Sequence, residues 1–95
     1  MTALRELRLN TGRSGNASIR IDSQRYLITP SGVHPRDLQE DQMVELPLAT
    51  TTIPATLRPS SEWRMHRDIF HTYETANAVV HTHSTAATAV ACLGL

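Results

Sequence analysis

The stretch that decides the fold is residues 60–83, SSEWRMHRDIFHTYETANAVVHTH, because the spacing of its hydrophobic residues changes part-way along. A repeat of about 3.6 residues predicts an amphipathic helix over residues 61–73. Asn77 interrupts this repeat, and residues 78–83 have the small and β-branched side chains that favour a strand. The sequence therefore predicts a helix that leads, through a turn, into a strand.

Shorter strands are predicted on the N-terminal side of this stretch. Residues 17–21 and 25–29 are separated by a turn and indicate a hairpin, and residues 43–48 indicate a third strand. On the C-terminal side, residues 85–95 are rich in alanine and favour a helix of small side chains. Because strands and helices alternate along the chain, we expect an α/β or α+β fold with a mixed sheet.

The composition excludes several classes of protein. The 95 residues leave room for one domain, and nine arginines balance nine acidic residues, with no lysine. The zero net charge gives no electrostatic signature for nucleic acid or an anionic membrane, and no apolar run approaches the ~20 residues that span a bilayer. The first residues do not resemble a signal peptide, and the single cysteine, Cys92, excludes an internal disulfide. We therefore expect a cytoplasmic domain, and the apolar last residues, 93–95, suggest a chain that is cut short.

Two histidines at the end of the last predicted strand are candidate metal ligands. His81 and His83 are two positions apart, so on a strand they face the same side, ~6.5–7 Å apart along the chain. Two imidazoles at that separation can bind one metal ion, and neutral imidazole is a common ligand of zinc. The alternative is a strand end with two surface histidines. A catalytic zinc site normally has three protein ligands, so this pair needs a further donor.

A carboxylate at the start of the predicted helix is a second candidate. With 100° per residue, Glu62 falls within the apolar stripe, between Ile69 and Tyr73 in angle, so it faces the protein interior. A carboxylate in such a setting can serve as a general acid or base. The alternative is a first-turn glutamate that interacts favourably with the helix dipole. If Ser60 caps the helix, Glu62 is its second residue and takes no part in a capping box.

Three short loops of small polar residues could bind an anion. They are residues 14–16, 29–32 and 60–61. Glycine and serine at strand ends and at a helix N-terminus offer backbone N–H groups and hydroxyls to a group such as phosphate. Each loop by itself is also explained as an ordinary turn, since turns use the same residues.

Four motifs, in this order and spacing, resemble a known protein family. They are residues 14–20 (SGNASIR), 26–32 (YLITPSG), 59–66 (PSSEWRMH) and 77–83 (NAVVHTH). Together they resemble the class II aldolase/adducin family, and within it most nearly the L-fuculose-1-phosphate aldolase branch. The resemblance covers most of the chain but only the N-terminal half of a typical member, so residues 1–95 are interpreted as the N-terminal portion of such a domain.

The resemblance implies a fold and a set of site residues. The fold would be a three-layer α/β/α sandwich with a central, mostly antiparallel sheet, assembled as a homotetramer. Glu62, His81 and His83 would bind a divalent metal, usually zinc, and Glu62 would also be the acid/base. The expected substrate-phosphate residues are Asn16, Ser31, Gly32, Ser60 and Ser61. Members of the family take a further histidine ligand from a portion that follows position 95.

The implied activity is that of a lyase that cleaves or forms a carbon–carbon bond in a small sugar phosphate. Zinc would stabilise an enediolate, and the absence of lysine from these residues fits this route, since a Schiff-base aldolase needs one. Two alternatives remain open: a methylthioribulose-phosphate dehydratase or sugar-acid phosphate decarboxylase, and an inactive remnant or interaction module of the same fold.

The other histidines are expected to have lesser roles. His34 is predicted in a surface turn and His71 on the polar face of the helix. His66 lies one turn from Glu62, so we expect it to orient that carboxylate or to pack in the interior.

Overall fold

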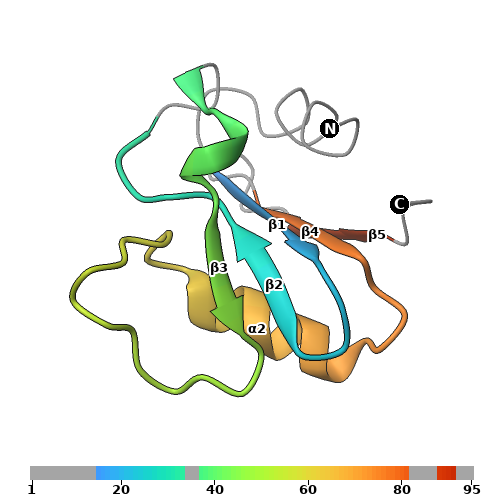
Figure 1. Cartoon of the computed structure of the whole chain (residues 1–95). Helices are drawn as coiled ribbons and strands as arrows, with labels where there is room; N and C mark the ends of the chain where they lie inside the picture. The colour runs from blue at the N-terminus through green and yellow to red at the C-terminus, as the bar shows by residue number, and fades with distance from the viewer. Residues whose placement is uncertain (1–14, 34–36, 82–87, 92–95) are drawn as a thin grey trace.

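A computed structural model of the chain describes residues 15–33, 37–81 and 88–91 (Figure 1). In chain order the elements are β1 (Asn16–Arg20), β2 (Arg25–Ile28), the 3₁₀ turn η2 (Glu40–Gln42), β3 (Val44–Pro47), α2 (Trp63–Thr72), β4 (Ala78–His81) and β5 (Thr88–Ala91). The strands form one sheet in the order β3-β2-β1-β4-β5, with β1 at its centre. Helix α2 crosses one face of this sheet.

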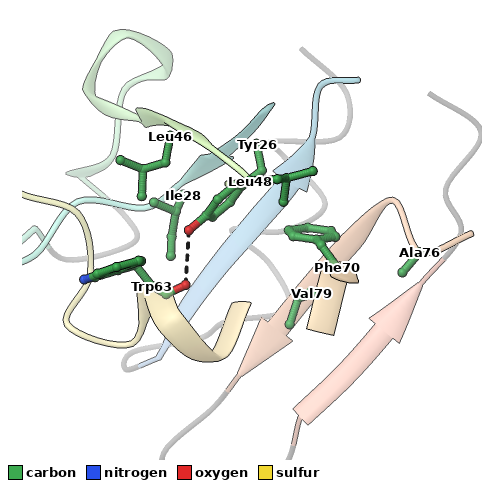
Figure 2. Packing of buried hydrophobic residues seen from close by; sticks show 8 residues of the cluster. All are labelled: Tyr26, Ile28, Leu46, Leu48, Trp63, Phe70, Ala76 and Val79. Carbon is green, nitrogen blue, oxygen red and sulfur yellow. Dashed lines mark hydrogen bonds between the residues drawn. The ribbon is translucent and has the colours of Figure 1, made fainter. Parts of the chain in front are cut away.

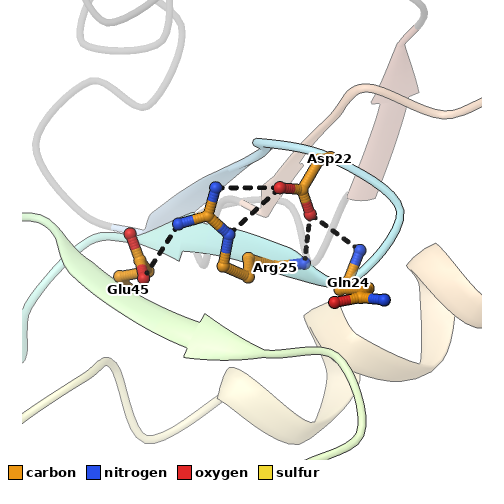
Figure 3. A network of polar contacts seen from close by, with 4 residues as sticks. All are labelled: Asp22, Gln24, Arg25 and Glu45. Atoms are coloured by element: carbon orange, nitrogen blue, oxygen red, sulfur yellow. Dashed lines mark hydrogen bonds and ion pairs between the residues drawn. The ribbon is translucent and has the colours of Figure 1, made fainter.

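All neighbouring strands in the described sheet are antiparallel. The predicted hairpin over residues 17–29 is confirmed as β1 and β2, although both strands are shorter or shifted by a residue. Its turn is fixed by the Asp22 carboxylate, which accepts hydrogen bonds from the backbone N–H groups of Gln24 (2.8 Å) and Arg25 (3.0 Å) (Figure 3). The Arg25 guanidinium bridges Asp22 and Glu45 of β3, so the three N-terminal strands are joined on the surface.

The main hydrophobic core lies between α2 and the sheet (Figure 2). Its buried members are Tyr26, Ile28, Leu46, Leu48, Trp63, Phe70, Ala76 and Val79. Tyr26 is fully buried, and its hydroxyl donates a hydrogen bond to the Trp63 carbonyl oxygen at 3.1 Å. Burial raises the pKa of Tyr26 to about 12. The first turn of α2 is therefore attached to β2 by both apolar packing and a buried hydrogen bond.

The central strand differs from its neighbours because its helix-facing row is polar. Asn16, Ser18 and Arg20 alternate along β1 and lie opposite His81, Ile28 and Tyr26 of the adjoining strands. The Arg20 guanidinium donates to the carbonyl oxygens of Phe70 (2.8 Å), Tyr73 (3.3 Å) and Ala76 (2.8 Å). It therefore binds a carbonyl in the last turn of α2 (Phe70), the carbonyl of the C-cap residue (Tyr73) and one in the turn that follows (Ala76).

Two predictions about the elements are wrong. Residues 88–91 lie within the stretch predicted as a helix, but they form β5, which pairs with β4 in the register His81↔Thr88. The open edge of β4 offers unpaired backbone groups, and a segment with alternating β-branched residues can satisfy them as a strand. The sheet is also antiparallel throughout its described part instead of mixed.

The α+β class and the mostly antiparallel sheet are confirmed, and the described residues form two layers, a sheet and a helix. The third layer of the expected sandwich stays a prediction. Within the described residues, no helix has the length and apolar character needed to cross a lipid bilayer.

Candidate metal and substrate site

The structure brings Glu62 and His81 together from different elements. Glu62 is the N-cap of α2, and His81 is the last residue of β4. The carboxylate Oε2 lies 3.2 Å from the imidazole Nε2, and both side chains are partly exposed, by 32% and 15%. α2 runs over the sheet and the chain returns along β4, so the start of the helix lies beside the end of that strand. The pair is therefore a contact between two groups that a ligand in solution can reach.

This pair has the donor chemistry of a zinc site. Carboxylate oxygen and imidazole nitrogen are both ordinary zinc ligands. His83, the other expected ligand in this chain, lies outside the described residues. In the part of the chain that is described, no group of three or more His, Cys, Asp or Glu side chains could hold a metal ion. Glu62 and His81 thus fit two positions of a metal site that needs further donors.

Behind this pair lies a buried hydrogen-bonded network centred on His66. The His66 side chain is fully buried, and its ring nitrogens contact Ser18 Oγ (from Nδ1, 2.5 Å) and Asn16 Oδ1 (from Nε2). An amide oxygen only accepts hydrogen bonds, so Nε2 donates to Asn16 and Nδ1 accepts from the Ser18 hydroxyl. Both ring nitrogens are therefore engaged within the protein.

Burial keeps His66 uncharged. Burial and, as the smaller cause, repulsion from His81 together lower the pKa of His66 to about 3. His66 was expected to orient Glu62 or to pack in the interior; it is buried, and its side chain contacts Asn16 and Ser18. His66 also contacts Glu62 through the helix backbone, because its N–H donates to the Glu62 carbonyl oxygen at 3.3 Å.

The expected phosphate loops lie side by side. An isolated bridge pairs Pro30 with Pro59, Ser31 N–H donates to the Arg58 carbonyl oxygen (3.0 Å), and Ser60 N–H donates to the Thr29 carbonyl oxygen (2.9 Å). The same Thr29 holds the start of β1, because its backbone N–H donates to the Ala17 carbonyl oxygen at 2.9 Å. Residues 29–32, residues 58–60 and the start of β1 therefore form one connected group.

The five expected phosphate residues differ in their surroundings. Ser31, Gly32 and Ser61 are exposed, whereas Asn16 and Ser60 are buried. Gly32 has φ +77°, a conformation that favours glycine, and no atom lies within 4 Å of the position that a Cβ would occupy. Ser60 Oγ accepts a hydrogen bond from Glu62 N–H at 3.2 Å, so this serine caps the turn before α2, whose N-cap is Glu62.

A cleft of about 560 Å³ opens beside Ser31, between residues 30–33 and 56–58 on one side and residues 41–45 on the other. Glu62 and His81 do not line it. The cleft and the Glu62–His81 pair are therefore separate features, and the charged lining of the cleft carries both signs, from Arg58, Asp41 and Glu45.

The remaining histidines are placed as follows. His71 is exposed on α2, as predicted, and its Nε2 donates to the Leu48 carbonyl oxygen at 2.6 Å. His34 lies outside the described residues.

A family model described as the class II aldolase and adducin N-terminal domain matches residues 1–95. The chain belongs to the class II aldolase and adducin family. This confirms the family that the four sequence motifs indicated.

Curated relatives of this chain are named either as aldolases or as dehydratases. A 5-methylthioribulose-1-phosphate/5-deoxyribulose-1-phosphate aldolase from Rhodospirillum rubrum is 42% identical over 88 residues, which cover 93% of this chain and 39% of the relative. The L-fuculose phosphate aldolase of Haemophilus influenzae is 38% identical over 90 residues (95% and 38%). A methylthioribulose-1-phosphate dehydratase from Yersinia enterocolitica is 38% identical over 74 residues (78% and 35%).

Solved structures agree with this membership. The L-fuculose-1-phosphate aldolase from Thermus thermophilus superimposes with a TM-score of 0.68 at 31% sequence identity, covering 86% of this chain and 44% of that structure. The chain thus spans less than half of the length of the relatives and structures described here.

Proposed function

We propose that this chain supplies the acid/base and part of the metal site of a class II aldolase-type lyase that acts on a small sugar phosphate. The observation that carries the proposal is the 3.2 Å contact between Glu62 Oε2 and His81 Nε2. It joins a carboxylate and an imidazole, which lie in two of the four motifs, at a position open to solvent. The names of the aldolase relatives support the class of substrate.

In this proposal Glu62, His81 and His83 bind a divalent metal, zinc by analogy with the family. When bound, the metal supplies a Lewis acid for the oxygens of the substrate. His81 is held for this task by the backbone pairing of β4 with β1, opposite Asn16. Glu62 is held by its place at the start of α2. Rigid elements on both sides thus fix the distance between the two donors.

Glu62 has a second role, as the group that moves a proton at the carbon next to the bond being broken. A carboxylate suits this role because it can accept and return a proton, and its partial exposure lets a substrate reach it. The chain has no lysine, so a covalent imine with the substrate carbonyl is excluded as a route within these residues.

The phosphate of the substrate is assigned to Asn16, Ser31, Gly32, Ser60 and Ser61. The connected loops support this role because they offer backbone N–H groups, hydroxyls and an amide within one group. Such neutral donors can bind a phosphate without a lysine or arginine. The open space at Gly32 leaves its backbone accessible to the ligand.

The complete site is proposed to form in a homo-oligomer, a tetramer as in the family, with a further histidine ligand from a region that this chain does not include. The 95 residues alone are therefore proposed to bind the metal weakly and not to turn over substrate. An inactive remnant or interaction module is the competing interpretation.

The metal site is tested by equilibrium dialysis of the purified chain against zinc at a concentration that saturates a weak site, with the bound zinc measured by mass spectrometry. We expect about one bound zinc per chain, lost in His81→Ala and retained in the control His71→Ala, whose imidazole lies elsewhere on α2. A chain that stays free of zinc but self-associates would instead support the interaction module.

A second candidate reaction is the dehydration of methylthioribulose 1-phosphate, which the names of relatives at 38% identity favour. Incubation of the assembled enzyme with this substrate, followed by mass spectrometry, separates the two. A product lighter by one water indicates a dehydratase, whereas two carbon fragments indicate an aldolase.

A further inference from the structure

We propose that His66 is a positioning residue, which holds the Asn16 side-chain amide so that its N–H donors face the substrate phosphate. This inference rests on the proposed function, since it concerns the same phosphate site. His66 is fully buried and cannot touch the substrate itself. Its role would be exerted through Asn16.

The direction of the hydrogen bonds determines which way the amide faces. The Ser18 hydroxyl donates to His66 Nδ1, and His66 Nε2 donates to Asn16 Oδ1, so the donors run in one direction from Ser18 to Asn16. With its oxygen against the ring, the amide turns its two N–H donors away from His66. The other neutral tautomer would accept from the amide instead and would leave the carbonyl oxygen facing the anion, which it repels.

Burial maintains this direction. Asn16, Ser18 and His66 are exposed by 4%, 0% and 0%, so water does not compete for their hydrogen bonds. The pKa of His66 is lowered to about 3, chiefly by burial, so the ring stays neutral and keeps one donor and one acceptor.

The location of Asn16 places the amide at the proposed site. Asn16 lies opposite His81 across the β1–β4 pair, so their side chains are on the same face of the sheet. The next residue, Ala17, is attached to the phosphate loops, because its N–H donates to Thr29 Oγ1 at 3.2 Å. Asn16 therefore lies between a proposed metal ligand and the loops proposed for phosphate.

The test uses inorganic phosphate as the probe and follows amide chemical shifts by NMR in the whole chain. We expect Asn16→Ala and Ser18→Ala each to weaken phosphate binding about 3- to 10-fold, the range for one neutral hydrogen bond. The double variant should be no weaker than Asn16→Ala alone, because Ser18 acts only through the Asn16 amide. Ser23→Ala, in the exposed β1–β2 turn, should bind like the wild type.

A purely structural role for the network predicts additive losses in the double variant, and that result would overturn the inference while leaving the proposed phosphate site intact. A wild-type chain that does not bind phosphate would overturn the phosphate site itself, and this inference with it.

A second measurement needs no variant. Long-range ¹H–¹⁵N spectra of the imidazoles should show His66 as the Nε2–H tautomer, with a proton that exchanges slowly because it is buried. A proton on Nδ1 would mean that the amide faces the other way, and the inference would be wrong.

Discussion

The two ends of helix α2 are both attached to β1, but by different chemistry. At the C-terminal end, Arg20 places a charged guanidinium against three carbonyl oxygens and lies 4.9 Å from the Phe70 ring centre. At the N-terminal end the contacts are neutral, through His66, Asn16 and Ser18. One polar row of a single strand thus anchors one helix end and supports the candidate site at the other. The Arg20 contact stabilises the fold. The His66 network carries no charge, so Glu62 and His81 are the ionisable groups at the candidate site.

The largest expected effect is on activity, at the N-terminal end. In the assembled enzyme, Glu62→Gln should reduce the proposed cleavage of sugar phosphate by about 10²- to 10⁴-fold, because it removes the proposed acid/base. Steady-state kinetics measure this loss. The matched variant Glu45→Gln, on the exposed edge of β3, should retain wild-type rates. Equal losses in the two variants would contradict the role of Glu62.

The next effect is on stability, at the C-terminal end. Arg20→Met should lower the free energy of unfolding by about 3 kcal/mol, because it leaves the Phe70 and Ala76 carbonyl oxygens without their charged partner. Urea unfolding measures the change, and zinc binding should be unaltered. Arg25→Met, which removes an exposed ion pair, is the control and should have a much smaller effect. If the two variants were equally stable, Arg20 would not be an anchor.

The stability that His66 contributes near the N-terminal end of α2 should also depend on pH. The pKa of His66 is about 3 in the folded chain and near 6.5 when unfolded, so below pH 6.5 the unfolded state binds a proton that the folded state does not. Stability from this group is therefore full above pH 6.5 and declines as the pH falls, by about 2 kcal/mol between pH 6.5 and pH 5. Urea unfolding of the wild type and of His66→Gln across this range gives the difference. Parallel curves would contradict the buried neutral ring.

The smallest effect is expected away from α2, in the surface network of Figure 3. The Arg25 guanidinium lowers the pKa of Asp22, so the stability from this carboxylate is present above its usual pKa of 3.8 and is lost as the pH falls below it. Arg25→Gln should shift the melting temperature only slightly, and 1 M salt should remove the difference because exposed charges are screened. A shift that persists at high salt would indicate packing instead.

The sequence predicted local structure better than long-range contacts. The period of residues 61–73 predicted α2. The expectation that Glu62 and His81 share one site came from the family resemblance, and the structure places their side chains 3.2 Å apart. The ligand and phosphate roles of these and the other site residues stay predictions.

The contacts of β1 could not be predicted in this way. The alternation of residues 17–21 predicted a strand but not the partners of its polar side chains, and Ser18 is fully buried. The partners of Ser18 and Arg20 are some 50 positions away, at His66 and Ala76, so only the register of α2 on the sheet determines them. The helix predicted over residues 85–95 was wrong for a related reason: pairing with β4 outweighed the local preference at residues 88–91.

The facing prolines of the two loops have a thermodynamic consequence. Pro30 and Pro59 lie across from each other in the isolated bridge, and each ring fixes its own backbone φ angle. If the two loops bind the substrate phosphate as proposed, the backbone at these two positions has little conformational freedom to lose on binding. Part of the entropic cost of ordering these loops would then already be met during folding.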